Sequence, residues 1–388
     1  MIKAAFLCWL LIFALAFSGC SGDARQLPMA TSTLQLDPEP DPVPDPVPDP
    51  EGDHPTVIPT NSARIPVTWQ NINLTGKLVY NMGAVDEENK YIVRIHALDL
   101  VTGDITVLYQ APLDAWIYYV SVSPDGKHVV MSYSPPLQTD PDVVQAIYIM
   151  PLDGSEPPEL LFMPKIREDQ YIQAEWSPDG KYIYYTHVIY RIPADPNRIH
   201  PLYKIYRMAY PGGQPELIAE EAYWPRLSPD SSRLIYVSAD PFSAQHQLIL
   251  ADADGGNARE VIMSGSDIPD IMDAPIFSSD GGTIIFSGAV PPQAYQPNWF
   301  EKLLGVRVAK AHDGGDLSDW WSVPVNGGEL ARLTNTRLAG LYADISPDNK
   351  HIVSFSRDEI FVMNPDGSKV TVLFSGLNRF YGTVNWIP

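Results

Sequence analysis

The segment AEWSPDGKYIYYTH, residues 174–187, contains a complete β-hairpin signal. A short strand leads into the turn Ser-Pro-Asp-Gly, and a second strand rich in Ile and Tyr follows it. Proline suits the second turn position because its ring fixes φ at about −65°. Glycine suits the fourth position because it takes the left-handed conformation without steric cost. The segment therefore predicts two antiparallel strands joined by a tight turn.

The same hairpin occurs four more times, so the chain is a repeat protein. The other copies are VSVSPDGKHVVMSY (120–133), PRLSPDSSRLIYVS (225–238), PIFSSDGGTIIFSG (275–288) and ADISPDNKHIVSFS (343–356), and successive turns lie 54, 51, 50 and 68 residues apart. Asn349 replaces the glycine of the last turn as the next best left-handed residue, whereas Ser231 is expected to be strained. A third strand, a Gly-bearing turn and a fourth strand follow each hairpin. Such four-stranded units are typical of propeller blades, which bury their faces only against neighbouring blades.

The two ends of the repeat region complete each other. The segment TGKLVYNM, from Thr75, matches the second half of a hairpin, and NWIP, at residues 385–388, matches the first half. We therefore predict that residues 382–387 form the innermost strand of a blade whose other strands come from the N-terminal end. Five complete blades and this shared blade give an all-β, six-bladed β-propeller that is closed by its C-terminal strand and leaves no open sheet edge.

The W-S-P-D-G-K-x-I-x-[YF] segments resemble the repeats of TolB-type six-bladed propellers. This family includes the periplasmic protein of the Tol-Pal envelope system, and the likeness covers nearly all of residues 75–388. The resemblance implies the fold. It implies little about activity, because such repeats also occur in the propellers of prolyl-oligopeptidase-type proteases and oligogalacturonide lyases.

The first residues indicate export. An apolar run at residues 4–17 follows Lys3 and leads into LAFSGC, residues 15–20, which resembles a bacterial lipobox. In proteins with a lipobox the signal peptidase cuts before the cysteine, so residues 1–19 would be removed and Cys20 would carry the lipid. The alternative is an ordinary signal peptide with a cysteine near its cleavage site. Cys8 would leave with the signal, so the mature chain could form no internal disulfide.

Residues 20–70 are predicted to form a stalk. Proline alternates with acidic residues or valine over residues 37–53, and this pattern excludes helix and sheet. The stretch is either an extended spacer or a disordered linker. It holds seven acidic residues, and the whole chain has a formal net charge of −21. Because such a charge repels phosphate groups, we expect no nucleic-acid partner and no attraction to anionic lipid head groups.

Residues 71–388 are predicted to form the propeller. The first and third turns of every blade share one face, here called the turn face, and the other connections open on the opposite face. Four long insertions fall on this opposite face, here called the insertion face, and they comprise residues 134–145, 188–203, 239–247 and 289–318. The longest one contains a helical apolar pattern over residues 298–311. It predicts either a docking helix or a helix that packs on its own propeller.

Aromatic and charged residues of the insertion-face loops form the predicted binding surface. Arginine would bind carboxylates and rings would stack on a sugar or a peptide terminus. The predicted binding residues are Tyr190, Arg191, Arg198, His200, His246, Trp299, Phe300, Arg337, Arg379 and Tyr381. The alternative for each of them is an ordinary solvated loop position.

Signals for catalysis are weak. The sequence has no G-x-S-x-G elbow, no H-E-x-x-H and no thiol in the mature chain besides Cys20. We therefore expect no catalytic residue, no cofactor and no metal. One alternative is a metal site built from His187, His200, His246 and His312. Another is a cation site in a loop between blades, predicted to be solvated, that contains Asp267, Asp270 and Asp273.

Together these features predict an exported lipoprotein, anchored through Cys20 in the cell membrane or outer membrane and facing the periplasm or the extracellular space. Its propeller is expected to be a monomeric, non-catalytic binding or scaffolding module for an envelope protein or a glycan. A first alternative is a polysaccharide-active lyase or hydrolase that uses the insertion face. A second is a structural spacer, which a channel plugged by aromatic side chains would favour.

Overall fold

The computed structural model describes ten stretches of the chain. They are residues 63–85, 91–136, 145–166, 168–190, 201–238, 246–265, 268–289, 317–357, 359–375 and 382–388. All of them belong to one compact unit, which comprises residues 55–308 and 315–388. The predicted signal sequence and Cys20 lie outside the described residues. Within the described stretches, no helix has the length and apolar character needed to cross a bilayer.

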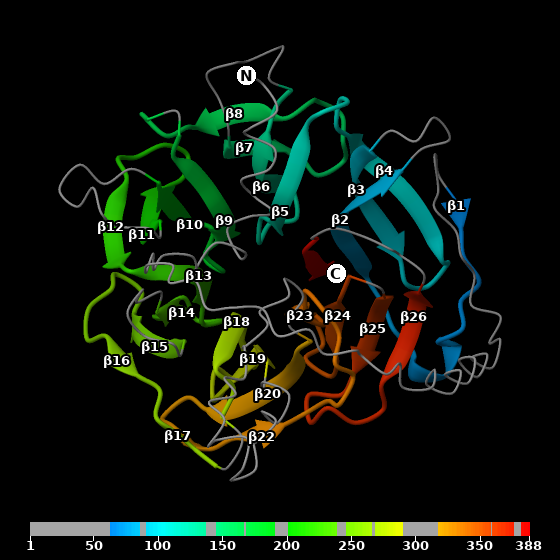
Figure 1. The fold of residues 1–388 in the computed structure, drawn as a ribbon. Helices are drawn as coiled ribbons and strands as arrows, with labels where there is room; N and C mark the ends of the chain where they lie inside the picture. Colours follow the sequence, from blue (N-terminus) through cyan, green and yellow to red (C-terminus); the bar gives the residue numbers. More distant parts are fainter. Residues whose placement is uncertain are drawn as a thin grey trace, which may run out of the picture. The chain divides into compact units, whose positions relative to one another are not determined.

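Six antiparallel sheets surround a central axis, and each forms one blade (Figure 1). Blade 1, from the inside outward, consists of β27 (Val384–Ile387), β2 (Lys77–Val85), β3 (Tyr91–Asp99), β4 (Asp104–Gln110) and β1 (Ala63–Arg64). Blade 2 consists of β5 (Trp116–Val122), β6 (His128–Ser134), β7 (Ala146–Pro151) and β8 (Glu159–Phe162). Blade 3 consists of β9 (Gln170–Trp176), β10 (Tyr182–Ile189), β11 (Leu202–Ala209) and β12 (Glu216–Glu220).

The other three blades follow the same plan. Blade 4 consists of β13 (Ala222–Leu227), β14 (Arg233–Ser238), β15 (Gln247–Asp252) and β16 (Arg259–Glu260). Blade 5 consists of β18 (Ile271–Phe277), β19 (Thr283–Ala289), β20 (Asp319–Pro324) and β22 (Ala331–Arg332). Blade 6 consists of β23 (Tyr342–Ile345), β24 (Ile352–Phe355), β25 (Glu359–Met363) and β26 (Thr371–Ser375). A short parallel pair, β17 (Met263–Ser264) with β21 (Gly328–Glu329), links blades 4 and 5.

The predicted closure of the ring is confirmed. Strand β27 pairs antiparallel with β2, and Trp386 lies opposite Leu78 in the register. Figure 1 shows the C-terminus at the inner end of blade 1. The Trp386 indole donates a hydrogen bond to the Thr75 carbonyl at 2.9 Å, so the chain end meets the start of the repeat region. The fold is therefore an all-β, six-bladed propeller whose first blade contains both ends of the repeat region.

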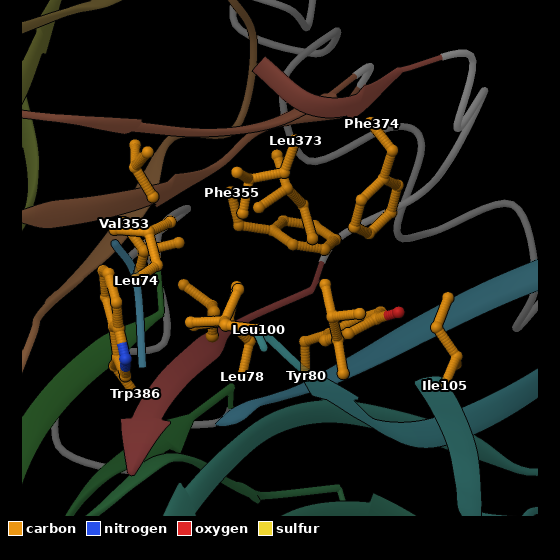
Figure 2. Close-up of a cluster of buried hydrophobic side chains, with 14 of the residues drawn as sticks. Leu74, Leu78, Tyr80, Leu100, Ile105, Val353, Phe355, Leu373, Phe374 and Trp386 are labelled. Carbon is orange, nitrogen blue, oxygen red and sulfur yellow. The ribbon is translucent and has the colours of Figure 1, made fainter. Parts of the chain in front are cut away.

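The core lies between the blades, as expected for sheets that are apolar on both faces. Figure 2 shows the cluster between blades 6 and 1, in which Leu78 and Tyr80 of β2 face Val353 and Phe355 of β24. All four side chains are at most 2% exposed. Because a fully buried side chain of this kind contributes about 1.5–3 kcal/mol, the seam that closes the ring is as strongly packed as an ordinary core.

A strap formed by residues 63–74 closes the same seam a second time, at its outer edge. Its strand β1 pairs with β4, and its 3-10 helix, η1, spans Gln70–Ile72. Ile65 and Trp69 are at most 2% exposed, and the Trp69 indole donates to the Leu100 carbonyl at 2.8 Å. The sequence analysis assigned residues up to 70 to the stalk and did not anticipate this packing.

The strap gives blade 1 a contact that the outer part of the preceding blade gives to other blades. In blades 2, 4, 5 and 6, a left-handed glycine of the turn between the third and fourth strands packs on a carbonyl of the preceding blade. A Cβ on Gly327, for example, would lie 2.6 Å from the Ile262 oxygen. In blade 1, Gly103 has the same conformation, and the carbonyl it meets is that of Ile65 in the strap. The strap therefore completes the outer edge of the ring as β27 completes the inner edge.

The first turns have the predicted conformation in all five copies. The fourth residue of each turn has a φ between 59° and 72° and donates its N–H to the carbonyl of the first serine at 2.8 Å. The serine hydroxyl in turn donates to the turn aspartate, as from Ser228 to Asp230 at 2.5 Å. Ser231, whose φ is 59°, accepts the Asp179 N–H of the preceding blade at 3.0 Å on its hydroxyl. This bond between blades explains a serine where glycine would be less strained.

Candidate functional site

The inner strands present two layers of side chains to the central channel. In each blade, one layer takes the residue four positions before the serine that begins the first turn, and the other layer takes the residue two positions before it. In blade 1, Ile387 stands at the place of this serine. The plug layer consists of Tyr119, Gln173, Trp224, Ala274, Tyr342 and Thr383. The charged layer, nearer the turn face, consists of Ser121, Glu175, Arg226, Ile276, Asp344 and Asn385.

Three aromatic rings of the plug layer meet across the channel. Tyr119, Trp224 and Tyr342 come from blades 2, 4 and 6, and the smaller side chains come from the blades between them. The Trp224 ring centroid lies 5.3 Å from that of Tyr119 and 5.4 Å from that of Tyr342. The remaining channel cavity has a volume of about 50 Å³. This volume holds a few water molecules, whereas sites for small molecules occupy about 300–1,000 Å³.

Backbone strain recurs in the plug layer. Gln173, Trp224 and Ala274 have φ values of 55°, 58° and 46°, although none of them is glycine. Each lies at a break in the register between the first and second strands of its blade. A β-bulge of this kind re-aims side chains, and a left-handed residue other than glycine costs about 1–2 kcal/mol. The bulges therefore turn side chains into the channel. Blades 3, 4 and 5 each carry this energetic cost once.

Arg226 organises the charged layer. Its guanidinium bonds Glu175 of blade 3 at 2.7 Å and lies 3.6 Å from Asp344 of blade 6. Burial raises the pKa of Glu175 above its usual value, and Arg226 acts against this rise. Burial likewise raises the pKa of Asp344, again opposed by Arg226. One cation is thus shared by two partly desolvated carboxylates.

Side chains of both layers bond the backbone of the next inner strand. Asn385 of blade 1 bonds Val120 and Val122 of blade 2, and Ser121 of blade 2 accepts the Trp176 N–H of blade 3 at 3.2 Å. These contacts satisfy inner-strand backbone groups that no neighbouring strand reaches, which matters because unpaired buried N–H groups are costly. The same pattern continues with Gln173, which accepts the Trp224 N–H, and with Asp344, which accepts the Trp386 N–H.

Blade 5 has only apolar residues in the two layers, Ala274 and Ile276. Arg226 spans this gap, since its guanidinium also donates to the Ala343 carbonyl of blade 6 at 3.4 Å. The channel residues therefore form a nearly continuous belt of side-chain bonds around the ring. This belt, here called the clamp, joins the inner strands of the blades to one another.

On the insertion side of the plug, His246 belongs to a hydrogen-bonded network. Its Nδ1 lies 3.1 Å from the Tyr223 hydroxyl, which donates to Asp273 at 3.2 Å. The Trp224 indole donates to the same Asp273 oxygen at 3.0 Å. Burial raises the pKa of Tyr223 well above its usual value, and the Asp273 carboxylate adds to the rise. The network connects a predicted binding residue to the aromatic plug.

The prediction for Asp273 was wrong in its structural part. We expected a solvated loop between blades, but Asp273 lies within β18 and accepts bonds from two aromatic side chains. Residues close in sequence gave no indication of this, because its partners Tyr223 and Trp224 lie about 50 residues earlier in the chain.

Three of the predicted binding residues lie in the described part of the chain, and each has separate partners. The Tyr190 hydroxyl donates to Gln170 at 3.2 Å, and His246 takes part in the network above. Arg337 is exposed, and its N–H is bonded to Asp319 at 3.1 Å. The other predicted residues lie outside the described stretches: Arg191, Arg198, His200, Trp299, Phe300, Arg379 and Tyr381. Convergence of these side chains on one ligand stays a prediction.

A histidine–carboxylate pair, which sequence analysis missed, lies beside Tyr190. His187 Nε2 is 2.9 Å from an Asp169 oxygen, and the Asp169 side chain is 3% exposed. Burial lowers the pKa of His187, and Asp169 opposes this shift. Among the described residues, no three His, Cys, Asp or Glu side chains gather in a way that could hold a metal ion.

The comparisons with known proteins agree with this geometry at the level of the fold. No protein-family model matches the chain, and no curated protein matches it. TolB from Acinetobacter baumannii has a similar structure, with a TM-score of 0.54 and 18% identity over 80% of this chain and 66% of that chain. A putative TolB from Agrobacterium tumefaciens has a TM-score of 0.50 and 18% identity over 81% of this chain and all of that chain.

A chain from a nidogen–laminin complex has a TM-score of 0.51 and 11% identity, over 79% of this chain and 97% of that chain. This chain therefore has the fold of a TolB-like six-bladed β-propeller, as its repeats predicted. At these identities the likeness establishes the fold alone.

Proposed function

We propose that the chain is an exported lipoprotein whose propeller is a non-catalytic binding or scaffolding module at the cell envelope. Its partner would be an envelope protein or a glycan. The four long insertions at equivalent connections carry the proposed binding role, and the filled channel favours binding outside the ring. Its cavity of about 50 Å³ is too small for a substrate, and its aromatic and charged side chains are bonded to one another. Binding is therefore expected on the surface rather than inside the ring.

The placement of the insertions supports the insertion face as that surface. Each of the four insertions falls at the connection between a second and a third strand, at β6–β7, β10–β11, β14–β15 and β19–β20. Antiparallel pairing brings these connections to one face of the ring. The resemblance to TolB proteins and the apolar N-terminal run support an envelope location. Residues 21–62 would then separate the propeller from a lipid at Cys20.

The test is partner recovery from envelope extracts with the tagged mature chain. A Trp299→Ala, Phe300→Ala double variant should lose the partner if the longest insertion docks it. The matched control is Leu160→Ala with Leu217→Ala, two exposed apolar residues on outer strands of blades 2 and 3. Equal recovery by wild type and both variants would remove the insertion as the docking element.

Anchoring has its own test, because it does not depend on the partner. A Cys20→Ser variant should incorporate no labelled fatty acid and should leave the membrane fraction. Retention of the variant in that fraction would contradict the lipid anchor and would leave the propeller proposal intact.

A structural spacer is the second candidate, and the aromatic plug of Tyr119, Trp224 and Tyr342 favours it. A spacer would recover no partner with any variant, whereas a binding module would recover one with the wild type. The polysaccharide-active alternative instead predicts that the purified chain cleaves a polysaccharide, and that His246→Ala lowers the rate.

A further inference from the structure

Buried polar atoms without partners gather in the seam between blades 2 and 3. Among the described residues, Ser132 Oγ, Gln145 Nε2, Asp169 Oδ1 and Trp176 Nε1 have no hydrogen-bond partner. Their side chains belong to residues that are 0%, 1%, 3% and 4% exposed. Buried polar groups in proteins are nearly always bonded, so a set of orphans at one place indicates bonds to something other than these side chains.

Three of these residues lie together at the insertion-face end of the seam. The Gln145 carbonyl accepts the Tyr171 N–H at 3.2 Å, and Asp169 precedes Tyr171 by two residues. Ser132 follows Val130 by two positions on β6, so both side chains point to the same side of the blade. Val130 packs with Tyr171 in the cluster that fills this seam. Blade 2 therefore contributes Gln145 and Ser132, and blade 3 contributes Asp169.

The unpaired atoms are chemically complementary. Asp169 Oδ1 is an acceptor, as carboxylate oxygens are. The other oxygen of the same carboxylate, Oδ2, bonds His187. The Gln145 nitrogen is a donor, and the Ser132 hydroxyl can do either. A hydroxyl group can accept from the amide and donate to the carboxylate at the same time. No apolar group and no simple cation or anion can satisfy both.

We infer that the insertion-face end of the blade 2–3 seam binds a hydroxyl group that bridges Asp169 Oδ1 and Gln145 Nε2. The group belongs either to an ordered water molecule or to a polyol such as a sugar. The site reaches the surface at His187, whose side chain keeps 16% exposure beside Asp169. The inference concerns the wall of the propeller, so it holds whether or not the chain carries a lipid.

The direct test is a crystal structure of the mature chain at a resolution that shows water, with and without soaked galactose. The expected result is an oxygen within about 2.6–3.2 Å of both atoms. Its replacement by a sugar hydroxyl in the soaked crystal identifies a polyol site, and an unchanged oxygen identifies a water site. A seam without such an oxygen, or direct contact between Gln145 and Asp169, overturns the inference.

A solution test uses Gln145→Met, which keeps the side-chain length and removes the donor. If the amide is bridged, the variant should lower the Tm by about 2–4 °C, as expected for one lost hydrogen bond. If the Gln145 amide nitrogen has no hydrogen-bond partner at all, an apolar side chain should leave the Tm unchanged or raise it. That result overturns the inference.

The matched controls are two fully buried serines. The Ser354 hydroxyl accepts the Trp320 indole N–H at 2.8 Å, so Ser354→Ala must lower the Tm in the same assay. Ser132→Ala should resemble Ser354→Ala if the bridging molecule also bonds Ser132. Its Tm should equal that of wild type if the bridging molecule bonds Gln145 and Asp169 alone. In that case the Tm of Gln145→Met decides whether the inference holds.

Discussion

Replacing Arg226 by methionine should destabilise the propeller by leaving two carboxylates without their shared cation. Breaking a buried ion pair from one side costs about 3–5 kcal/mol, whereas an exposed pair contributes about 0.2–1 kcal/mol. The side chains of Arg226, Glu175 and Asp344 keep 23%, 21% and 29% exposure, which places them between these cases but nearer the buried one. We expect a loss of about 2–3 kcal/mol at pH 7.

The loss should depend on pH in a defined direction. Burial already raises the pKa of Glu175 and of Asp344, so the folded chain binds more protons there than the unfolded chain. Such groups reduce stability as pH rises from the unfolded pKa of about 4 through the folded pKa. Without Arg226 the opposing shift is lost, and both pKa values rise further. Arg226→Met should therefore be closer to wild type at pH 4 than at pH 7.

Urea unfolding followed by tryptophan fluorescence at the two pH values measures this difference. A triple variant that adds Glu175→Gln and Asp344→Asn should recover most of the loss, because neutral side chains need no cation. Arg259→Met is the matched control, since Arg259 is exposed and its guanidinium bonds the uncharged groups of Val325 and Asn326. The reasoning is refuted if Arg226→Met matches Arg259→Met at pH 7, or if its loss is the same at both pH values.

Two further outcomes test the closure and the turns. Trp69→Ala and Trp386→Ala should each lower the free energy of unfolding in urea by about 3–5 kcal/mol, because both side chains are buried at the closing seam. Leu217→Ala, at an exposed position, should match wild type. An unchanged unfolding free energy for Trp69→Ala would show that the strap is not part of the core. The Ser228 hydroxyl and the Ser232 N–H lower the pKa of Asp230 to about 2, so its stabilising contribution is present above the unfolded pKa of about 3.9 and is lost as pH falls to about 2. Asp230→Asn should flatten acid unfolding over this range, and an unchanged acid titration would contradict this role.

The turns and the ring closure could be predicted because both depend on local chemistry. A left-handed fourth residue is specified by Gly, Asn or a neighbouring bond, and the repeat then fixes which strand pairs with which. Placing NWIP before TGK therefore predicted that the C-terminal strand pairs with the segment around Leu78, and in the structure Trp386 lies opposite Leu78. No contact between distant side chains had to be known for this step.

The strap and the plug layer could not be predicted in the same way. Ile65 and Trp69 lie in a segment without strand alternation, and only the Ile65 carbonyl next to Gly103 shows that the strap packs on blade 1 as the preceding blade does elsewhere. The left-handed residues of the plug layer include Trp224, a residue type that gives no turn signal. Gln173 and Trp224 each take part in a bond to the next blade, and such bonds have no signature in a single sequence.

The composition of the charged layer bears on what the channel is for. A ligand site would need polar groups left free to bind, yet Asp344 and Asn385 are bonded to the backbone of the following blade, and Arg226 is bonded to two carboxylates. The one apolar member, Ile276, lies where Arg226 passes from blade 4 to blade 6. Since the belt continues across this position, its bonds serve the ring itself. The clamp holds the inner strands in place, and the loops on the insertion face are then free to differ without loss of the fold, which is the arrangement expected of a binding propeller.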